Sequence, residues 1–390
     1  MSSEVSSQQD PASRGRRLWE LARLFLKLGT IGFGGPAAHL ALMEAECVRR
    51  RRWLTHGEFL DMVGATNLIP GPNSTELAIH IGRLRAGGPG LVVAGACFIL
   101  PAMLLVMGCG WLYVTYGQLP QVGALLYGMK PAIIAIILQA LWGLGKSAVK
   151  SVMLAVVGSA VVVGNVCGVE ELVLLASAAL VSLAWRWKGT SSRNLTLALP
   201  MTPAVLGTAG VAVPFGLWPM FLFFLKVGAV LFGSGYVLLA FLRADLVDRW
   251  HWLSEAQLFD AIAVGQVTPG PVFTTATFIG YLLGGVPGSL VATVGIFLPA
   301  FVFVAISAPL LSRLRASPAA GAFLDGLNVA SLALMAVVTW HLGRSALVDG
   351  LTIAIALVAV ALLLRFRVNS MWLLLGGAVV GLVLSAGSRV

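Results

Sequence analysis

Long stretches without a charged side chain dominate this sequence. Asp, Glu, Lys and Arg are absent from six runs, at residues 86–128, 151–169, 172–185, 261–312, 329–340 and 351–364. A helix that crosses a bilayer needs about 20 apolar residues, so the longest runs have room for two segments each. The pattern predicts an all-α protein that crosses a lipid bilayer several times, with short polar loops between its helices.

The chain also repeats itself at a spacing of about 200 residues. An offset of 199 aligns Lys27 with Lys226, Trp53 with Trp252, Asp61 with Asp260, and Pro70-Gly71-Pro72 with Pro269-Gly270-Pro271. One residue then drops out, and the match continues through Gly145 and Gly343. Solenoid repeats have periods of about 20–50 residues, so this repeat is a duplicated half. Two apolar halves with Gly and Pro interruptions at matching places are typical of secondary transporters.

Two segments in each half are interrupted by Gly and Pro. In the first half, residues 18–48 are interrupted at 32–36 and flanked by basic clusters on both sides, and residues 59–82 are interrupted at Pro70-Gly71-Pro72. A full crossing would place one basic cluster outside, so we expect re-entrant hairpins. Proline kinks in ordinary spans are the alternative. Irregular backbone at membrane depth is tolerated where it lines a polar cavity, so the breaks indicate a substrate route.

The charges of the two copies predict that the second half is inverted. The four arginines at 49–52 correspond to Asp248-Arg249-Trp250-His251, so the second copy has lost positive charge there. Loops on the outer face carry fewer Lys and Arg residues. An inverted second copy needs an odd number of preceding crossings, and residues 195–217 are a candidate for the additional one. We predict a polar basic tail at 1–17, a first domain at 18–187, a linker with a connecting span at 188–217, and a second domain at 218–390.

Composition and net charge further limit the class of protein to which this chain can belong. Hydrophobic residues make up 58% of the chain and charged residues 11%, against about 25% charged in soluble domains. The net charge of +10 comes from short basic clusters between apolar runs, which indicates membrane orientation rather than a nucleic-acid partner. We expect no cleavable signal, because the first 17 residues are polar and basic. A multi-pass protein of the inner (plasma) membrane is the expected localisation, and a homo-oligomer is compatible with it.

Lys27 and Lys226 are candidate substrate-binding residues because both copies keep a lysine in an apolar segment. A charge inside a span costs at least about 2.5–3.5 kcal/mol, so it is a functional hypothesis by default. Snorkelling of the lysines to the membrane surface is the alternative.

The breaks themselves are candidate anion sites. Helices that start there have free N–H groups and a positive dipole end, and glycine lets the backbone approach an ion closely. Packing of small residues between spans is the alternative. The candidate binding residues at the breaks are Gly34, Gly35, Gly233, Ser234, Pro70, Gly71, Asn73, Ser74, Thr75, Gly270, Thr274 and Thr275.

Five further residues are candidate coupling or gating groups, namely Glu76, Asp61, Asp260, His39 and Lys130. Glu76 has no acidic counterpart in the second copy and is a candidate proton carrier, with a favourable charge at a helix start as the alternative. Lys130 corresponds to Asn328, so its role would be asymmetric. Buried histidines such as His39 are more often hydrogen-bonded interior residues.

Enzyme signatures are missing from the sequence. It contains no HExxH, no phosphate-binding P-loop and no CxxC motif. The four cysteines, Cys47, Cys97, Cys109 and Cys167, lack the spacing of metal ligands, so we expect neither a metal nor a cofactor. A membrane-embedded enzyme or a scaffold are the alternatives from other classes, and neither explains two copies of a charged, broken helix.

The repeated motifs resemble those of the chromate transporter (CHR) family, long two-domain type. The resemblance rests on FLKLGTIGFGGPAAH, RRRRWL and PGP in the first half and on FLKVGAVLFGSGY, TPGP and FIGYLLGG in the second, and it covers about residues 20–385. It implies efflux of chromate by two homologous domains of opposite orientation, driven by membrane potential or a proton gradient. The second copy departs from the pattern, because Gly233-Ser234-Gly235 lacks the proline of the first copy. Sulfate, similar in size and equal in charge, is the alternative cargo.

Overall fold

The computed structural model describes residues 11–188, 213–232, 237–307, 317–366 and 368–387, and within these ranges it is helical and contains no strand. The first half comprises α1 (Pro11–Ile31), α2 (Gly35–Glu44), the π-helix η1 (Ala45–Arg50), α3 (His56–Thr66), α4 (Asn73–Tyr116), α5 (Pro120–Ala148), α6 (Val152–Val166) and α7 (Glu171–Lys188). The second half comprises α8 (Leu217–Val230), α9 (Leu238–Phe241), the π-helix η3 (Leu242–Arg249), α10 (Glu255–Val267), the 3₁₀-helix η4 (Val272–Thr274), α11 (Thr275–Ser307), α13 (Pro318–Ala346), α14 (Gly350–Ala361), the π-helix η5 (Leu362–Phe366) and α15 (Ser370–Gly387).

The two halves repeat the same elements in the same order, down to local backbone detail. Thr55 with Glu58 and Ser254 with Gln257 form equivalent capping boxes at the starts of α3 and α10. A capping box satisfies two of the free N–H groups at a helix start, which fixes where the helix begins. The equivalent residues Arg52 (φ 51°) and His251 (φ 54°) both adopt the left-handed conformation just before these caps.

The helices α4 and α11 each fold back on themselves at a matching point. Ala86 and Gly87 leave helical geometry in α4, and Gly284 and Gly285 do so in α11 with dihedral angles that agree within a few degrees. The short arm before each bend packs closely on the long arm after it. A Cβ on Gly82 would lie 2.2 Å from the carbonyl oxygen of Gly90, so only glycine allows this approach.

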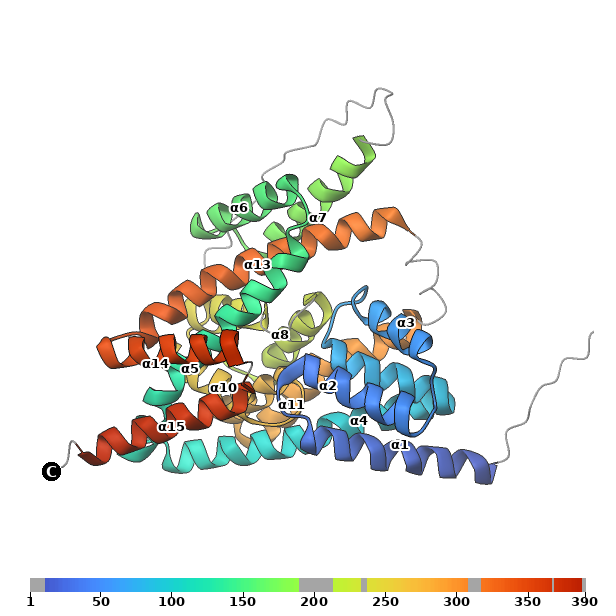
Figure 1. Cartoon of the computed structure of the whole chain (residues 1–390), viewed down its shortest axis with the longest axis horizontal. Coiled ribbons are helices and arrows are strands. Elements are labelled where there is room, and N and C mark those ends of the chain that lie inside the picture. The colour runs from blue at the N-terminus through green and yellow to red at the C-terminus, as the bar shows by residue number, and fades with distance from the viewer. Residues whose placement is uncertain (1–10, 189–212, 233–236, 308–316, 367, 388–390) are drawn as a thin grey trace, which may run out of the picture.

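Equivalent helices of the two halves run antiparallel. Along the contact between α4 and α11, Gly95 meets Phe301 whereas Gly110, later in α4, meets Tyr281, earlier in α11. Between α5 and α13, Tyr127 bonds to the Asp349 carboxylate just beyond α13, and Lys150 bonds to Asp325 near its start. The colours of α4 and α11 in Figure 1 run in opposite directions. The predicted inverted repeat is therefore confirmed.

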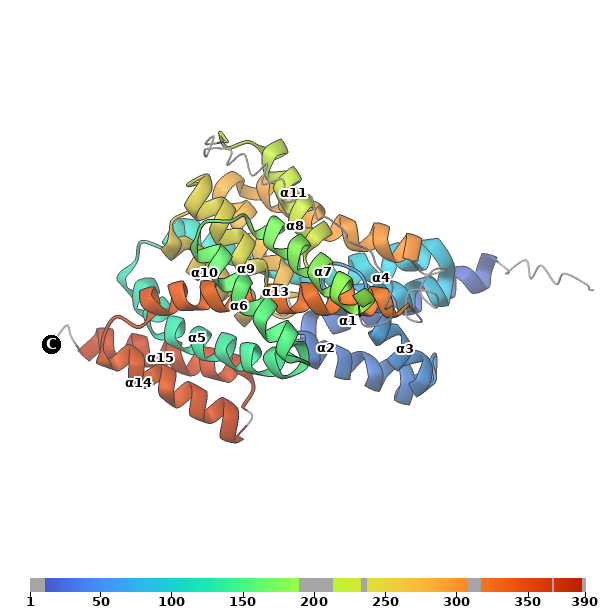
Figure 2. The ribbon, with the colours of Figure 1, turned by 90° about the horizontal axis from the view of Figure 1, so that it is seen from above.

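The halves are also interlocked. Helices α6 and α7 of the first half pack on α13 of the second, and α14 and α15 of the second half pack on α5 of the first (Figures 1 and 2). Backbones approach closely there, since a Cβ on Gly128 would lie 2.0 Å from the carbonyl oxygen of Gly377. The core runs across both halves, so neither half encloses a complete core by itself.

Within the described ranges, four helices are long and apolar enough to cross a membrane: α4, α5, α13 and the helix from Val272 to Ser307. Four shorter apolar helices accompany them. The protein is thus a multi-pass, all-α membrane protein. The chain breaks between α1 and α2 and between α3 and α4, as the Gly and Pro motifs predict. The predicted connecting span lies mostly outside the described residues, and α1 begins at Pro11, within the predicted polar tail.

Candidate functional site

The Pro-Gly-Pro break of each half is hydrogen-bonded to the other half. The Gly71 N–H donates to the Leu231 carbonyl at 2.8 Å, and the Gly270 N–H donates to the Gly32 carbonyl at 2.9 Å. The offset of 199 residues relates Gly71 to Gly270 and Gly32 to Leu231. The two hydrogen bonds are therefore equivalent, and each half donates one to the other. The breaks of both halves therefore meet near the axis that relates the halves.

Glycine is required at both of these positions. Gly71 (φ 139°) and Gly270 (φ 99°) have backbone conformations that other residues rarely adopt. A Cβ would lie 2.3 Å from a carboxylate oxygen of Glu76 at Gly71 and 2.5 Å from the Ala102 Cβ at Gly270. A side chain at either position would be strained by the backbone conformation and would displace Glu76 or Ala102 beside the reciprocal bonds.

A cavity of 660 Å³ lies at this junction, and we call it the central cavity. Three helix starts border it, those of α2 at Pro36, α4 at Pro72 and η4 at Pro271. No side chain caps any of the three, so their first N–H groups are available to a ligand. Pro72 and Pro271 are the N-cap residues, which precede the first residue of each helix.

The polar lining of the central cavity is almost entirely neutral. Amide and hydroxyl side chains come from both halves: Asn67, Asn73, Ser74, Ser147, Asn328 and Ser331. The single charged lining residue is Lys150, which is mostly exposed and pairs with Asp325 at 2.6 Å. Helix N-termini with neutral donors can hold an anion without a permanent countercharge. Asn67, Ser147, Asn328 and Ser331 were not predicted, because they lie outside the Gly and Pro motifs.

The predicted binding residues divide into two groups. Asn73 and Ser74 line the central cavity, and Gly71 and Gly270 directly precede its lining residues Pro72 and Pro271. The hydroxyls of Thr274 and Thr275 instead donate to carbonyls of their own turn. Thr75 is fully buried, Gly34 and Gly35 have positive φ at the start of α2, and Gly233 and Ser234 lie outside the described residues.

Lys27 and Lys226 do not line the central cavity. The Lys27 ammonium lies 2.7 Å from Glu46, and the Lys226 ammonium lies 2.7 Å from Asp245. Glu46 and Asp245 are equivalent at the same offset, and both sit in π-helical turns. Neither acid was predicted as a partner of its lysine, although both copies keep an acidic residue at this position.

Arginines complete both ion pairs. Arg50 bonds to Glu46 and its equivalent Arg249 bonds to Asp245, while Arg51 also reaches Glu46 at 3.4 Å. Glu46 lies outside the helices that are able to cross the membrane. The Lys27 hydrogen bond lowers the pKa of Glu46, against the opposing effect of desolvation, and Arg51 and Arg50 lower it further.

Glu76 is fully buried, and its carboxylate oxygens have no hydrogen-bond partner among the described residues. It lies in the first turn of α4 against Gly71, beside the reciprocal bond between the halves. A carboxyl group buried without a partner is costly in a structural role. Glu76 can bind or release a proton at the place where the two halves meet.

Two of the candidate coupling groups lie in contact across the halves. The Lys130 ammonium lies 3.1 Å from the Asp260 carboxylate, and the Tyr113 hydroxyl donates to Asp260 at 2.7 Å. Asp260 is buried, whereas its counterpart Asp61 is exposed. His39 is a buried interior residue whose Nε2 is 2.8 Å from the Gly32 carbonyl.

The comparison with known proteins matches the two halves of the chain as two separate regions. A sequence profile of the family described as Chromate transporter matches residues 19–190 and 218–382. A Chromate transport protein of Cupriavidus metallidurans is 35% identical over 94% of this chain and 93% of its own length. A Probable chromate transport protein of Synechococcus elongatus is 34% identical over 88% of each chain, and a Chromate transport protein of Pseudomonas aeruginosa is 31% identical over 88% of this chain and 86% of its own. The comparison with solved structures gave no match.

Proposed function

Because this chain belongs to the chromate transporter family, we propose that it carries chromate across a membrane through the central cavity. Chromate is a tetrahedral dianion. The observation that supports this role is the meeting of three uncapped helix starts on one cavity, which is lined by both halves. Helix N-termini at breaks near the middle of a membrane are a common way to hold anionic groups in transporters.

The inverted repeat suggests how access alternates. Equivalent helices run antiparallel. A movement that opens one half toward one face of the membrane therefore has an equivalent movement in the other half, which opens toward the opposite face. The reciprocal bonds of Gly71 and Gly270 hold the breaks together between these states. The neutral lining favours release, because a fixed countercharge would bind the dianion more tightly.

Transport runs outward in this proposal. An interior-negative potential favours exit of a dianion by about 4.6 kcal/mol per 100 mV, twice the value for one charge. Efflux through the plasma membrane would lower the internal chromate concentration and so confer resistance. Glu76 is the proposed carrier of a coupled proton, since it is buried without a partner beside the junction. The contact of Lys130 with Asp260 is a second charged link between the halves.

Sulfate or a related oxyanion is the second candidate cargo. The neutral amide and hydroxyl lining supports it, because such donors bind any tetrahedral dianion of similar size. Nothing in the lining is a soft or redox-active group that would favour chromate. A homo-oligomer remains a prediction from the sequence.

Transport in inside-out vesicles tests the proposal. Vesicles containing the protein should accumulate chromate above the level of empty vesicles, and collapse of the proton gradient at constant potential should slow uptake if Glu76 couples a proton. Sulfate in excess should compete if both oxyanions share the cavity. Correctly oriented protein that accumulates neither oxyanion would refute the proposed function.

A further inference from the structure

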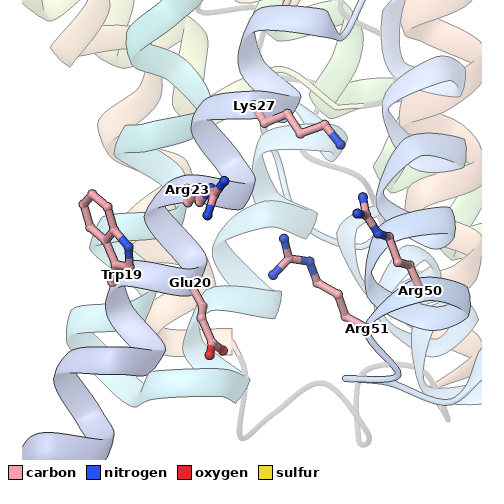
Figure 3. A pocket seen from close by; sticks show the side chains of 6 residues that line it. All are labelled: Trp19, Glu20, Arg23, Lys27, Arg50 and Arg51. Atoms are coloured by element: carbon pink, nitrogen blue, oxygen red, sulfur yellow. The ribbon is translucent and has the colours of Figure 1, made fainter.

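A second pocket lies outside the central cavity, between α1 and the end of η1. We call it the basic pocket; it has a volume of 570 Å³ and is lined by Trp19, Glu20, Arg23, Lys27, Arg50 and Arg51. Figure 3 shows Arg23 and Lys27 on α1 facing the space into which Arg50 and Arg51 reach from the opposite side. Four basic side chains therefore converge on one space from two elements.

Acidic neighbours neutralise only part of this charge. Glu46 lies behind Lys27, Arg50 and Arg51, and Glu20 is the single acid among the lining residues. Glu20 is shared with Arg16 and Arg85 outside the lining, so the four lining bases keep an excess of positive charge. Arg23 forms no ion pair with any of the described residues. Arg51 stacks on Trp53 at 5.0 Å, which orients its guanidinium group.

The equivalent place in the second half lacks most of these basic side chains. The positions of Arg23, Glu20 and Arg51 are occupied there by Leu222, Pro219 and Trp250. Trp250 packs on Phe223 at 5.4 Å and on Trp252 at 4.7 Å, so aromatic rings are clustered where the first half has a guanidinium group. Lys226, Arg249 and Asp245 remain, and Glu170 lies 3.9 Å from Arg249. The excess charge is thus a feature of the first half, and the inversion places the two sites on opposite faces.

We propose that the basic pocket is a binding site for a tetrahedral oxyanion group, with no equally basic counterpart in the second half. Guanidinium groups match such oxyanions in geometry, and a basic cluster at the surface raises the local concentration of anions. The group is either a free dianion or the phosphate of an anionic phospholipid, since Trp19 beside the pocket is exposed as interfacial aromatic residues are. As a loading site for cargo, it rests on the proposed function and gives transport a preferred side.

The test uses the purified full-length protein in nanodiscs of neutral lipid. Arg23→Leu copies the second half, and Arg14→Leu is the matched control, because it removes the same charge from an exposed position on α1 outside the pocket. Equilibrium dialysis with radiolabelled sulfate should give a Kd raised about tenfold by Arg23→Leu, the loss of one charge-assisted hydrogen bond, and changed less than about twofold by Arg14→Leu.

Further measurements distinguish a free oxyanion from a lipid phosphate, and the basic pocket from the central cavity. An unchanged sulfate Kd together with less phosphatidylglycerol retained by Arg23→Leu on purification from native membranes would identify the lipid phosphate as the ligand. Unchanged sulfate binding and unchanged lipid retention would overturn the proposal. Asn73→Ala in the central cavity should keep the Arg23-dependent binding. Binding is measured here without transport. The binding result therefore tests the basic pocket even if the protein does not transport chromate.

Discussion

The ammonium of Lys27 lies 2.7 Å from the Glu46 carboxylate across a span of 19 residues, and the second half repeats this pair as Lys226 and Asp245. The duplicated chain therefore keeps an ion pair that ties α1 to the π-helical turn after α2, rather than a free lysine. In each half a carboxylate pairs with the lysine and with at least one arginine, and these ion pairs hold the two arms of the broken hairpin together.

Loss of these carboxylates should loosen the hairpins. Glu46→Gln should lower the free energy of unfolding by about 1–2 kcal/mol, because three cations lose their partner but are themselves partly exposed. Asp245→Asn should cost more, since Asp245 and its partners are better buried. Thermal unfolding in detergent would measure both. Glu44→Gln is the control, because Glu44 is more exposed, and an equal loss there would contradict a special role for Glu46.

The contribution of Glu46 should also depend on pH. Its pKa is lowered in the folded protein, so its stabilising effect is complete above the unfolded value of about 4.3 and is lost as the pH falls through the lower folded value. The difference in melting temperature between the wild type and Glu46→Gln should therefore be constant at neutral pH and shrink in acid. A difference that grows in acid would show that the sign is wrong.

Substitution of the glycines in the breaks should abolish transport. Gly71→Ala places a Cβ 2.3 Å from the Glu76 carboxylate, and Gly270→Ala places one 2.5 Å from the Ala102 Cβ. Both also impose an unfavourable φ, so the bonds between the halves should weaken. Gly57→Ala is the control, because it lies in α3 with open space around it and should be neutral or stabilising by about 0.4–1 kcal/mol. Chromate uptake in vesicles, normalised to protein amount, measures the effect, and full activity of Gly71→Ala would exclude the junction as the site.

Removal of the buried carboxyl group should separate transport from the proton gradient. Glu76→Gln keeps the shape of the side chain and removes its ability to exchange a proton. We expect uptake driven by membrane potential to persist and its response to a pH gradient to vanish. Glu58→Gln, an exposed capping residue, is the control. A variant that responds to the pH gradient as the wild type does would assign coupling to another group, with Asp260 the next to test.

Equivalent surface positions should be reached from opposite sides of the membrane. Arg49→Cys and Asp248→Cys occupy the same place in the two halves, and both side chains are substantially exposed. In a background with the four native cysteines replaced by alanine, a membrane-impermeant maleimide should label only one of them in sealed vesicles of a single orientation. Labelling of both from one side would contradict the placement of these positions on opposite faces.

Much of the fold follows from the sequence because the repeat and the breaks are local signals. Uncharged runs predict the membrane helices, Pro70-Gly71-Pro72 predicts the break before α4, and the loss of arginines in the second copy predicts the inversion. The bonds that Gly71 and Gly270 make between the halves could not be predicted from the sequence. Alignment of the two copies shows which residues are equivalent, but it does not show which residues are in contact.

The candidate site was predicted less completely for a similar reason. Charged residues in apolar segments attract attention, so Lys27 was expected at the substrate, whereas its partner Glu46 lies close only once the hairpin has formed. Asn328 and Ser331 line the cavity from the middle of a long helix, where neutral polar residues have no distinctive pattern in the sequence. Lys130 and Asp260 were each noted singly, and only the packing of the two halves brings them together.

The exchange of helix pairs between the halves has a consequence for biosynthesis. Helix α5 is covered by α14 and α15, and α15 is the last helix of the described chain to leave the ribosome. Until nearly the whole chain has been inserted, one face of α5 in the first half is in contact with lipid instead of with α14 and α15. Final assembly is therefore a late event after translation, and shortening the chain by α15 alone would leave both halves unfinished.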